Sequence, residues 1–156
     1  MTRNSGSQTS DASLLSDYYR QLNSDLHRRD PNYGTTGRRY VEAVRSLALL
    51  YSARTILDYG CGKRDLWKAL ANEFDPAIPE FASPPEPADF VACIDVLEHV
   101  EPTFLENALM DLARVTIKVV FFTIASKPSG KDLADGSNCH RIVENSRWWH
   151  DTLNQH

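Results

Sequence analysis

The stretch TILDYGCGKRDLWKAL, residues 55–70, decides which fold the chain is expected to adopt. Its first five residues, 55–59, are mostly apolar and predict a short buried strand. Gly60 and Gly62 follow, and glycine permits both a sharp turn and a close approach of a ligand to the main chain. Asp65 is a good helix cap and predicts a helix over about 66–73. The stretch therefore predicts a strand, a glycine turn and a helix in succession.

Strands and helices are expected to alternate along the rest of the chain. The further elements are helices at about 11–29, 36–51, 103–115 and 145–153, strands at about 90–94 and 118–126, and a short extended piece at 139–143. Residues 75–89 are rich in proline and predict a loop with no clear strand. Alternating strands and helices imply crossover connections and a parallel sheet covered by helices, so the expected fold class is α/β.

Two helices are expected before the first strand. In the first, an apolar face is formed by Leu15, Tyr18, Leu22 and Leu26, and Asp30-Pro31-Asn32 ends the helix. In the second, the expected buried side consists of Tyr40, Val41, Val44, Leu47, Ala48 and Tyr51. Residues 1–10 are polar and predict a disordered tail, and residues 11–156 are expected to form one domain.

Composition limits the classes of function. The chain has 156 residues, 42% of them hydrophobic and 24% charged, as in ordinary globular proteins. A net charge of -4 argues against a broad basic face for nucleic acid. Three cysteines without C-x-x-C spacing indicate reduced thiols in a cytoplasmic setting, and the His and Cys spacing indicates no metal site. No apolar run is long enough to span a bilayer, and no secretory signal is evident.

The two glycines lie where a ligand would bind in such a sheet. Ligands of parallel α/β sheets collect at the carboxyl ends of the strands, where the chain turns into the next helix. The first backbone N–H groups of that helix are able to bind a polar or negative group. Asp58, at the strand end, is able to hold an ammonium group, ordered water or the turn itself. A tight structural turn and a ligand site both remain open at this point.

Two motifs resemble those of the class I S-adenosylmethionine (SAM)-dependent methyltransferases. The string D-Y-G-C-G-K-R-D, from Asp58, resembles their first motif, which is written acidic-x-Gly-x-Gly-x-Gly. The string ADFVACIDVLEHVEP, residues 88–102, resembles their fourth-strand segment, in which an Asp-Val-Leu-Glu-His run is frequent. The resemblance covers about residues 36–150. It implies a Rossmann-like three-layer sandwich with a reduced, mainly parallel sheet.

The resemblance also implies roles for individual residues. Asp58, Gly60, Cys61 and Gly62 would surround the amino-acid part of SAM. Asp75 would accept hydrogen bonds from both ribose hydroxyls, since an ionised carboxylate is an acceptor only. Asp95, Val96 and Leu97 would lie beside the sulfonium, with Glu98 and His99 beginning the next turn. Tyr33, in a loop between the first two helices, would fold over the methionine end; alternatively, this loop is only a connector.

The chain departs from the family pattern in three places. Arg64 replaces the third glycine. Few residues separate Gly62 from Asp75, so the second strand is expected to be very short or absent. The antiparallel strand pair that usually ends the family fold does not follow the last helix, which implies a short or truncated member. An uncovered sheet edge invites pairing with another chain, so a homo-oligomer is expected through that edge.

His140 is the candidate catalytic residue. It follows a Gly-Ser-Asn loop on the side where substrates enter, and it would act as a general base or orient the substrate. Alternatively it packs against Trp148 and Trp149, which themselves form either core or an aromatic wall. The chain resembles methyltransferase-like proteins of phage and bacteria in having a His followed by a Trp-Trp pair.

The expected function is therefore a SAM-dependent methyltransferase with a small-molecule acceptor. Such an enzyme holds donor and acceptor in line and excludes water. Two alternatives stay open: a SAM-binding protein that cleaves or sequesters SAM or supports a catalytic subunit, and a module for another dinucleotide such as NAD. Neither a nucleic acid nor a membrane is expected as a partner.

Overall fold

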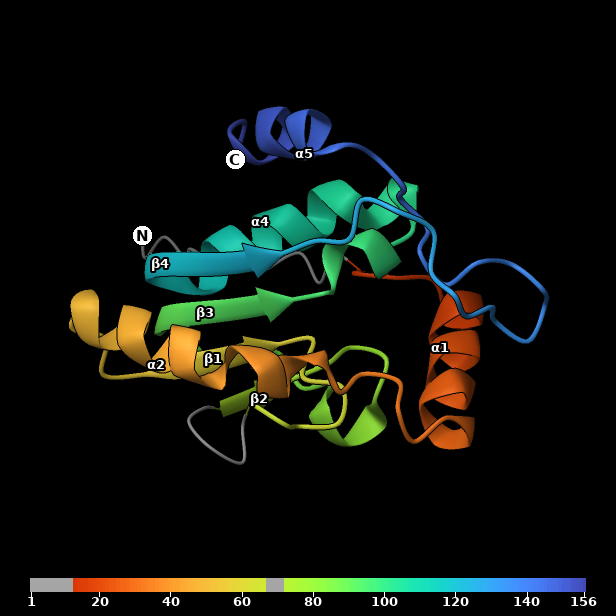
Figure 1. The fold of residues 1–156 in the computed structure, drawn as a ribbon, viewed down its shortest axis with the longest axis horizontal. Helices are drawn as coiled ribbons and strands as arrows, with labels where there is room; N and C mark the ends of the chain where they lie inside the picture. The colour runs from red at the N-terminus through yellow and green to blue at the C-terminus, as the bar shows by residue number, and fades with distance from the viewer. Residues whose placement is uncertain (1–12, 67–71) are drawn as a thin grey trace, which may run out of the picture.

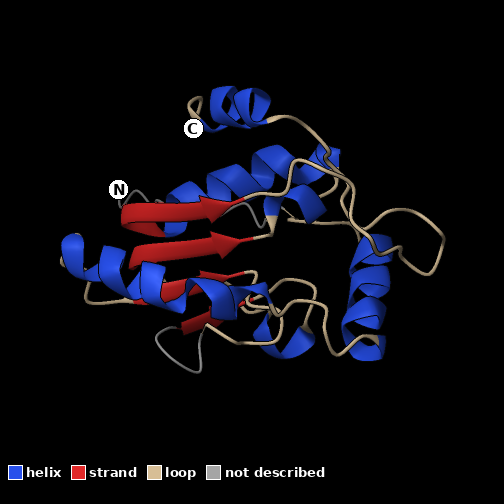
Figure 2. Ribbon diagram, in the orientation of Figure 1, coloured by secondary structure: helices blue, strands red, loops and turns tan. Residues whose placement is uncertain are grey.

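The computed structural model describes residues 13–66 and 72–156. Its helices and strands are α1 (Asp17–Arg29), α2 (Val41–Leu50), β1 (Ile56–Tyr59), β2 (Asn72–Phe74), β3 (Ala88–Ile94), α4 (Leu105–Val115), β4 (Thr116–Thr123) and α5 (Ser146–Leu153). Short 3₁₀ turns lie at Thr36–Tyr40, Pro79–Phe81, Leu97–His99 and Pro102–Phe104. Figures 1 and 2 show strands that run side by side, with helices around them. The predicted tail, 1–10, lies outside the described residues.

The four strands form one sheet in the order β2-β1-β3-β4. All three neighbouring pairs are parallel, with Asp58 opposite Glu73 and Ala92, and Cys93 opposite Phe122. The predicted α/β class is confirmed. The chain leaves β1 to one side to form β2 and returns to the other side to form β3, so the sheet has a switch point between β1 and β3.

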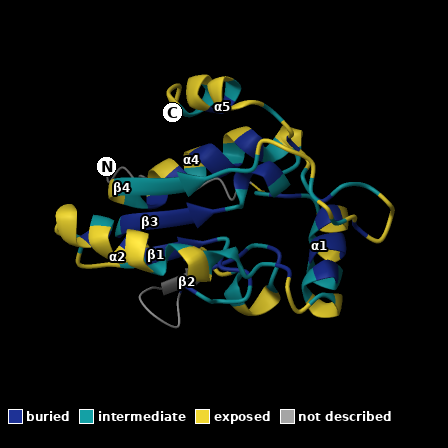
Figure 3. Cartoon of the chain, in the orientation of Figure 1, coloured by how far each residue is buried: buried dark blue, intermediate teal, exposed yellow. Residues whose placement is uncertain are grey.

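Helices cover both faces of this sheet because β3 is apolar on both sides. Phe90 and Ala92 pack toward Val44 of α2, whereas Val91 and Cys93 belong to the cluster that contains α4 and α5. Consecutive residues of a strand point to opposite faces, which accounts for the alternation. Figure 3 shows β3 buried along its length between α2 and α4. Burial on both faces explains why this strand was recognisable as a continuous apolar run.

Helix α1 lies beyond the carboxyl ends of the strands, across from their arrowheads (Figure 1). It begins at Asp17 and not near residue 11, because the Ser16 hydroxyl caps it by accepting the Tyr19 N–H at 3.1 Å. This start changes the predicted face: Tyr19 is buried, whereas Tyr18 is 64% exposed. The helix ends at Arg29, as the Asp-Pro-Asn sequence predicts. The predicted start and the predicted burial of Tyr18 are thus wrong.

Other differences from the expected elements are local. The second helix divides into a 3₁₀ turn, Thr36–Tyr40, and α2, and Tyr51 is 48% exposed because α2 ends before it. Strand β2 occupies Asn72–Phe74, so a helix reaching residue 73 is wrong; residues 67–71 of that helix lie outside the described part. No strand forms at 139–143. Residues 75–87 contain no strand, as expected.

No helix among residues 13–66 and 72–156 has the length and apolar character needed to cross a bilayer.

Candidate functional site

A cavity of about 280 Å³ lies at the carboxyl ends of the strands. One wall is formed by the ends of β1 and β3 and the turns that follow them, that is, by the switch point of the sheet. The other wall comes from α1, the loop after it and residues 129–140. Its volume is close to the lower end of the range of ligand pockets, about 300–1,000 Å³. The switch point of a parallel sheet is also where such ligands bind.

The cavity brings together nearly all of the predicted site residues. Those that line it are Tyr33, Asp58, Gly60, Cys61, Gly62, Asp75, Asp95, Val96 and His140. Leu97 does not line it: the 3₁₀ turn Leu97–His99 directs this fully buried side chain into the hydrophobic core. Glu98 is also buried away from the cavity, where its Oε1 accepts the Ala125 N–H at 2.7 Å and burial raises its pKa to about 7.

The backbone N–H groups of the glycine turn are used by the protein itself. Gly60 and Cys61 donate to the Phe74 carbonyl at 2.7 and 3.0 Å, and Gly62 donates to Asp75 Oδ2 at 3.1 Å. The next two N–H groups, of Lys63 and Arg64, donate to the carbonyls of Gly34 and Cys61. The helix whose first N–H groups were expected to bind a ligand was predicted to begin at residue 66, and residues 67–71 lie outside the described part, so that expectation stays a prediction; the N–H groups of these five residues are engaged by the protein. They close the turn.

The two glycines are required by close backbone and side-chain approaches. Gly60 has φ +77°, and a β-carbon there would lie 2.4 Å from Val96 Cγ2. Gly62 has φ +50°, and its β-carbon would lie 2.7 Å from the carbonyl oxygen of Gly34. Arg64, in the position of the missing third glycine, keeps a left-handed φ of 63°. The backbone of the turn is therefore left-handed at position 64 as well, although the residue there is not glycine.

The Asp75 carboxylate stabilises this turn by accepting backbone hydrogen bonds. It is 7% exposed; its Oδ2 accepts the Gly62 N–H and its Oδ1 accepts the Ala77 N–H at 2.9 Å. Burial raises the pKa of the carboxyl, while the two backbone hydrogen bonds oppose that rise. Each oxygen retains a second lone pair, but a ribose would have to share this carboxylate with the turn. A structural role of Asp75 is established independently of any ligand.

The tips of β1 and β3 add two further carboxylates to the sheet wall. Asp58 lies within β1 and is 4% exposed. Asp95 follows β3 with φ 52°; its N–H donates to the Thr123 carbonyl at 2.8 Å and its Oδ1 accepts the Thr123 hydroxyl at 3.2 Å. A left-handed aspartate costs of order 1–3 kcal/mol and persists only when its surroundings hold it. Here the end of β4 holds it.

Two histidines and a tyrosine meet where the turn after β3 contacts the opposite wall. The Tyr33 hydroxyl lies 3.2 Å from His99 Nδ1, and the His99 and His140 rings meet edge to face with centroids 4.7 Å apart. Burial, with a smaller contribution from His140, lowers the pKa of His99 to about 4. His140 Nδ1 lies 2.7 Å from the Lys127 carbonyl, so Nδ1 carries the hydrogen and Nε2 keeps its lone pair. Asn138 Oδ1 fixes this residue by accepting its N–H at 3.0 Å.

Sequence reasoning missed the polar face that α1 presents to the cavity. Tyr19, Asn23 and His27 all line it and follow one another at four-residue steps. Asn23 Oδ1 and His27 Nδ1 are buried and have no hydrogen-bond partner among the described residues. Burial, followed by the nearby Lys63 charge, lowers the pKa of His27 to about 4. The i, i+4 spacing of an amide and an imidazole beside Leu22 and Leu26 was the available signal.

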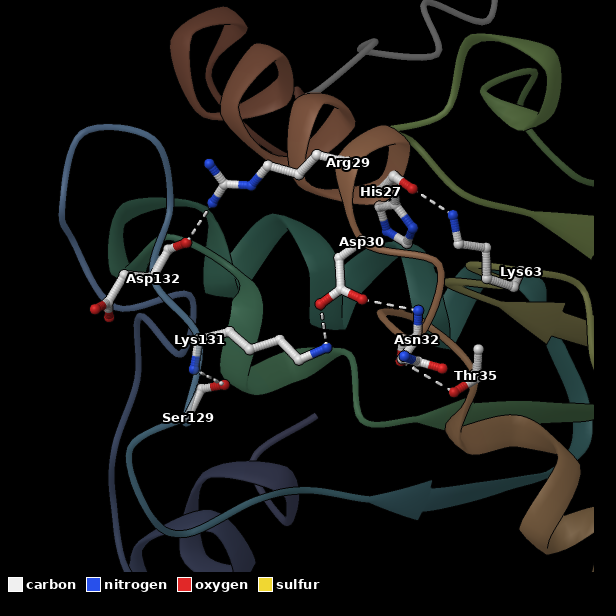
Figure 4. Close-up of polar contacts among 9 residues, drawn as sticks. All are labelled: His27, Arg29, Asp30, Asn32, Thr35, Lys63, Ser129, Lys131 and Asp132. Atoms are coloured by element: carbon white, nitrogen blue, oxygen red, sulfur yellow. Dashed lines mark hydrogen bonds and ion pairs between the residues drawn. The ribbon is translucent and has the colours of Figure 1, made fainter.

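Charged side chains hold the second wall in place (Figure 4). Lys63 Nζ donates to the His27 carbonyl, which links the glycine turn to the end of α1. Arg29 Nη2 donates to the Asp132 carbonyl at 2.6 Å, and Lys131 forms an ion pair with Asp30. These contacts join α1 to the loop after β4. Figure 4 shows them converging from three segments that are distant in sequence.

The tandem tryptophans lie away from the cavity. Trp149 is buried in the cluster beneath α4, Trp148 packs against the same cluster, and their rings meet edge to face at 5.0 Å. Neither lines the cavity, which favours packing over an aromatic wall. All three cysteines are buried, and none forms a disulfide.

Comparisons with family models, with curated proteins and with solved structures find no match to this chain.

Proposed function

We propose that the chain is a SAM-dependent methyltransferase with a Rossmann-like fold and a small-molecule acceptor. One observation carries the proposal: the cavity at the switch point joins three carboxylates of the sheet wall, Asp58, Asp75 and Asp95, to His140 on the opposite wall. The strand order β2-β1-β3-β4 agrees with it, because it places the two motif segments on neighbouring strands.

The residues of the sheet wall suit a cationic ligand. SAM supplies a methyl group activated by a positively charged sulfonium. Buried or half-buried carboxylates attract such a cation more strongly than they would in water, because the local dielectric is lower. Gly60 and Gly62 bring bare main chain to the same wall. The wall offers few free N–H donors, so binding is expected to depend on carboxylates.

His140 is proposed as the proton acceptor for the second substrate. Its Nδ1–H donates to the Lys127 carbonyl, which fixes the ring and leaves Nε2 able to take a proton from a hydroxyl or thiol. The cavity then serves to align donor and acceptor and to exclude water. A protein that binds SAM without transferring its methyl group would share the sheet wall and lack this proton transfer.

Asp95→Asn provides the sharpest test. Asparagine tolerates the left-handed backbone and can still accept the Thr123 hydroxyl, so only the charge is removed. Calorimetry with SAM, S-adenosylhomocysteine and NAD should show binding of the first two and not of NAD. In the variant, SAM should bind about tenfold more weakly, while S-adenosylhomocysteine, which lacks the positive charge, should lose less.

Asp151→Asn on the exposed face of α5 is the matched control and should change neither affinity. Equal losses for the two ligands would contradict a sulfonium next to Asp95. If wild-type protein binds neither ligand, the proposal is wrong. A methyl-transfer assay run beside a test for SAM breakdown products separates transfer from cleavage or storage.

A further inference from the structure

Three potential metal ligands meet beside the cavity, two of which, His99 and His140, line it. They are His99, from the 3₁₀ turn after β3, and Cys139 and His140, from the loop before α5. One ligand atom of each residue lies within 4.8 Å of the ligand atoms of the other two. The fold brings these residues together, whereas sequence spacing indicates no metal site, because His99 is far from the adjacent pair.

Backbone carbonyls orient both imidazoles. His99 Nδ1 lies 2.9 Å from the Cys139 carbonyl, and His140 Nδ1 lies 2.7 Å from the Lys127 carbonyl. A carbonyl only accepts, so each Nδ1 carries a hydrogen and each Nε2 keeps its lone pair. Metal-binding histidines usually donate their second ring N–H in this way, which fixes both tautomer and ring orientation.

We propose that His99, Cys139 and His140 form a binding site for a divalent transition-metal ion such as zinc. Two imidazoles and a thiolate are ligands that zinc binds well, at about 2.0–2.1 Å for nitrogen and 2.3 Å for sulfur. Tetrahedral coordination would bring the ligand atoms to about 3.3–3.6 Å from one another, as those bond lengths require. The ligand atoms, which lie within 4.8 Å of one another, therefore have to approach by at most about 1.2–1.5 Å.

Three protein ligands leave the fourth tetrahedral position open. Zinc sites of this composition hold water or a substrate atom there, in contrast to structural sites with four protein ligands. His99 and His140 line the cavity, so the open position faces it. The matching ligand class is a small molecule that presents a hydroxyl, thiol or carboxylate oxygen to the ion.

The binding reaction balances with one proton. The Cys139 thiol loses its proton to the buffer as the sulfur–metal bond forms, while both imidazoles bind in their neutral form. Binding requires no SAM and thus goes beyond the proposed methyl transfer. An ion bound to His140 Nε2 occupies the lone pair that is proposed to take the substrate proton, so His140 cannot play both roles at the same time. Failure of either proposal is visible without the other, because the metal titration contains no SAM and the SAM titration is repeated with a chelator.

The test is a titration of the full chain with Zn²⁺ and, separately, with Co²⁺. Wild-type protein should bind a single equivalent, release about one proton per ion, and with Co²⁺ develop a thiolate-to-metal charge-transfer band in the near ultraviolet. Cys139→Ser should abolish that band and weaken Zn²⁺ binding by about tenfold or more. His140→Ala, at a partly exposed position, should also weaken Zn²⁺ binding. This variant replaces Cys139→Ser in the test if circular dichroism shows that Cys139→Ser does not fold.

Cys61→Ser and His150→Ala are the matched controls. Cys61 is a second thiol lining the same cavity, and His150 is an exposed imidazole on α5. Both variants should keep the wild-type metal affinity and spectrum. A charge-transfer band that survives Cys139→Ser, or one that disappears in Cys61→Ser, would overturn the assignment. Failure of the wild-type chain to bind either ion would overturn it as well.

Discussion

The two walls of the cavity differ in how their polar atoms are used. On the sheet wall, the N–H groups from Gly60 to Arg64 and both oxygens of Asp75 are engaged by the protein. On the opposite wall, Asn23 Oδ1 and His27 Nδ1 are buried without a partner among the described residues. The N–H groups of the glycine turn in the first wall are internally satisfied, whereas the second wall retains hydrogen-bonding capacity for a ligand.

This difference shows that the motif that locates the cavity and the side chains that remain able to bind a ligand are not the same residues. The glycine motif places a turn so that the ends of β1 and β3 remain open beside it, and its glycines are fixed by contact with Gly34 and Val96. Buried polar groups without partners are costly, and in a native protein they often point to a ligand. The motif therefore identifies the position of the cavity, while α1 supplies two of its buried polar atoms without a partner among the described residues.

The largest expected effect tests the satisfied wall. Gly62→Ala should lower the free energy of unfolding by roughly 3 kcal/mol, because alanine is strained at φ +50° and its β-carbon would lie 2.7 Å from the Gly34 carbonyl oxygen. Gly34 also accepts the Lys63 N–H, so that segment has little freedom to retreat. Urea unfolding followed by circular dichroism measures the change.

Two other glycines separate the causes. Gly136 has φ +80° with nothing within 4 Å of its would-be β-carbon, so Gly136→Ala should show backbone strain alone, about 1–2 kcal/mol. Gly130 has neither feature, and Gly130→Ala should be nearly neutral. Equal losses at positions 62 and 136 would mean that the contact between the glycine turn and residue 34 contributes nothing.

The unsatisfied wall is tested by pH. The pKa of His27 falls from an ordinary value near 6.5 to about 4 in the folded chain, so the unfolded chain binds a proton that the folded chain excludes between these values. The contribution of His27 to stability should therefore rise as pH increases from about 4 to 6.5, by at most about 3 kcal/mol, and be complete above that window, and the similarly lowered pKa of His99 contributes in the same direction. Unfolding midpoints measured across this range should follow that slope.

His27→Gln should flatten this slope, while the exposed His150→Gln should leave it intact. Glu98 contributes in the opposite direction: its pKa is raised by burial, so the folded chain binds the extra proton and stability falls as pH increases from about 4.5 to 7. Both proteins contain Glu98, so its contribution cancels when the stability of His27→Gln is subtracted from that of wild type at each pH. A difference that does not depend on pH would mean that His27 is not protected from protonation.

The sequence predicted those parts of the fold that depend on local pattern. Strands β1 and β3 were recognisable because buried strands are continuous apolar runs. The end of α1 was recognisable because a proline restricts the backbone of the residue before it, here Asp30. The start of α1 and the inward turn of Leu97 were missed, since a single serine cap and a 3₁₀ turn rotate the face that is buried. These are small geometric shifts that hydrophobic periodicity does not resolve.

The candidate site divides in the same manner. Its position followed from the motif, and the cavity indeed contains Asp58, Gly60, Gly62, Asp95 and His140. The engagement of Asp75 by the turn, the approach of residue 34 and the meeting of His99 with residues 139 and 140 depend on contacts between distant segments. A single sequence carries no local signal for such contacts, so they required the three-dimensional arrangement.

The smallest expected effect concerns Arg64, which stands where the family pattern has a glycine. Its left-handed φ of 63° costs about 1–2 kcal/mol relative to glycine. Its guanidinium lies 4.8 Å from the centre of the Phe81 ring, a contact worth about 0.5–1 kcal/mol. Glycine also loses more backbone freedom on folding, about 0.5–1 kcal/mol. Arg64→Gly should therefore change stability by less than about 0.5 kcal/mol, since these contributions nearly cancel.

Ser52→Gly is the matched comparison outside the cavity. Ser52 follows α2 with a similar φ of 50°. Its N–H donates to the Leu49 carbonyl and its carbonyl accepts from Lys118 Nζ, and neither bond involves its side chain. Glycine is favoured at this position after a helix, so the variant should gain about 0.5–1 kcal/mol. If Arg64→Gly gains as much as Ser52→Gly, the arginine is uncompensated strain. If it instead loses stability, the side chain of Arg64 holds the glycine turn closed, and the sheet wall depends on it as well as on Gly60 and Gly62.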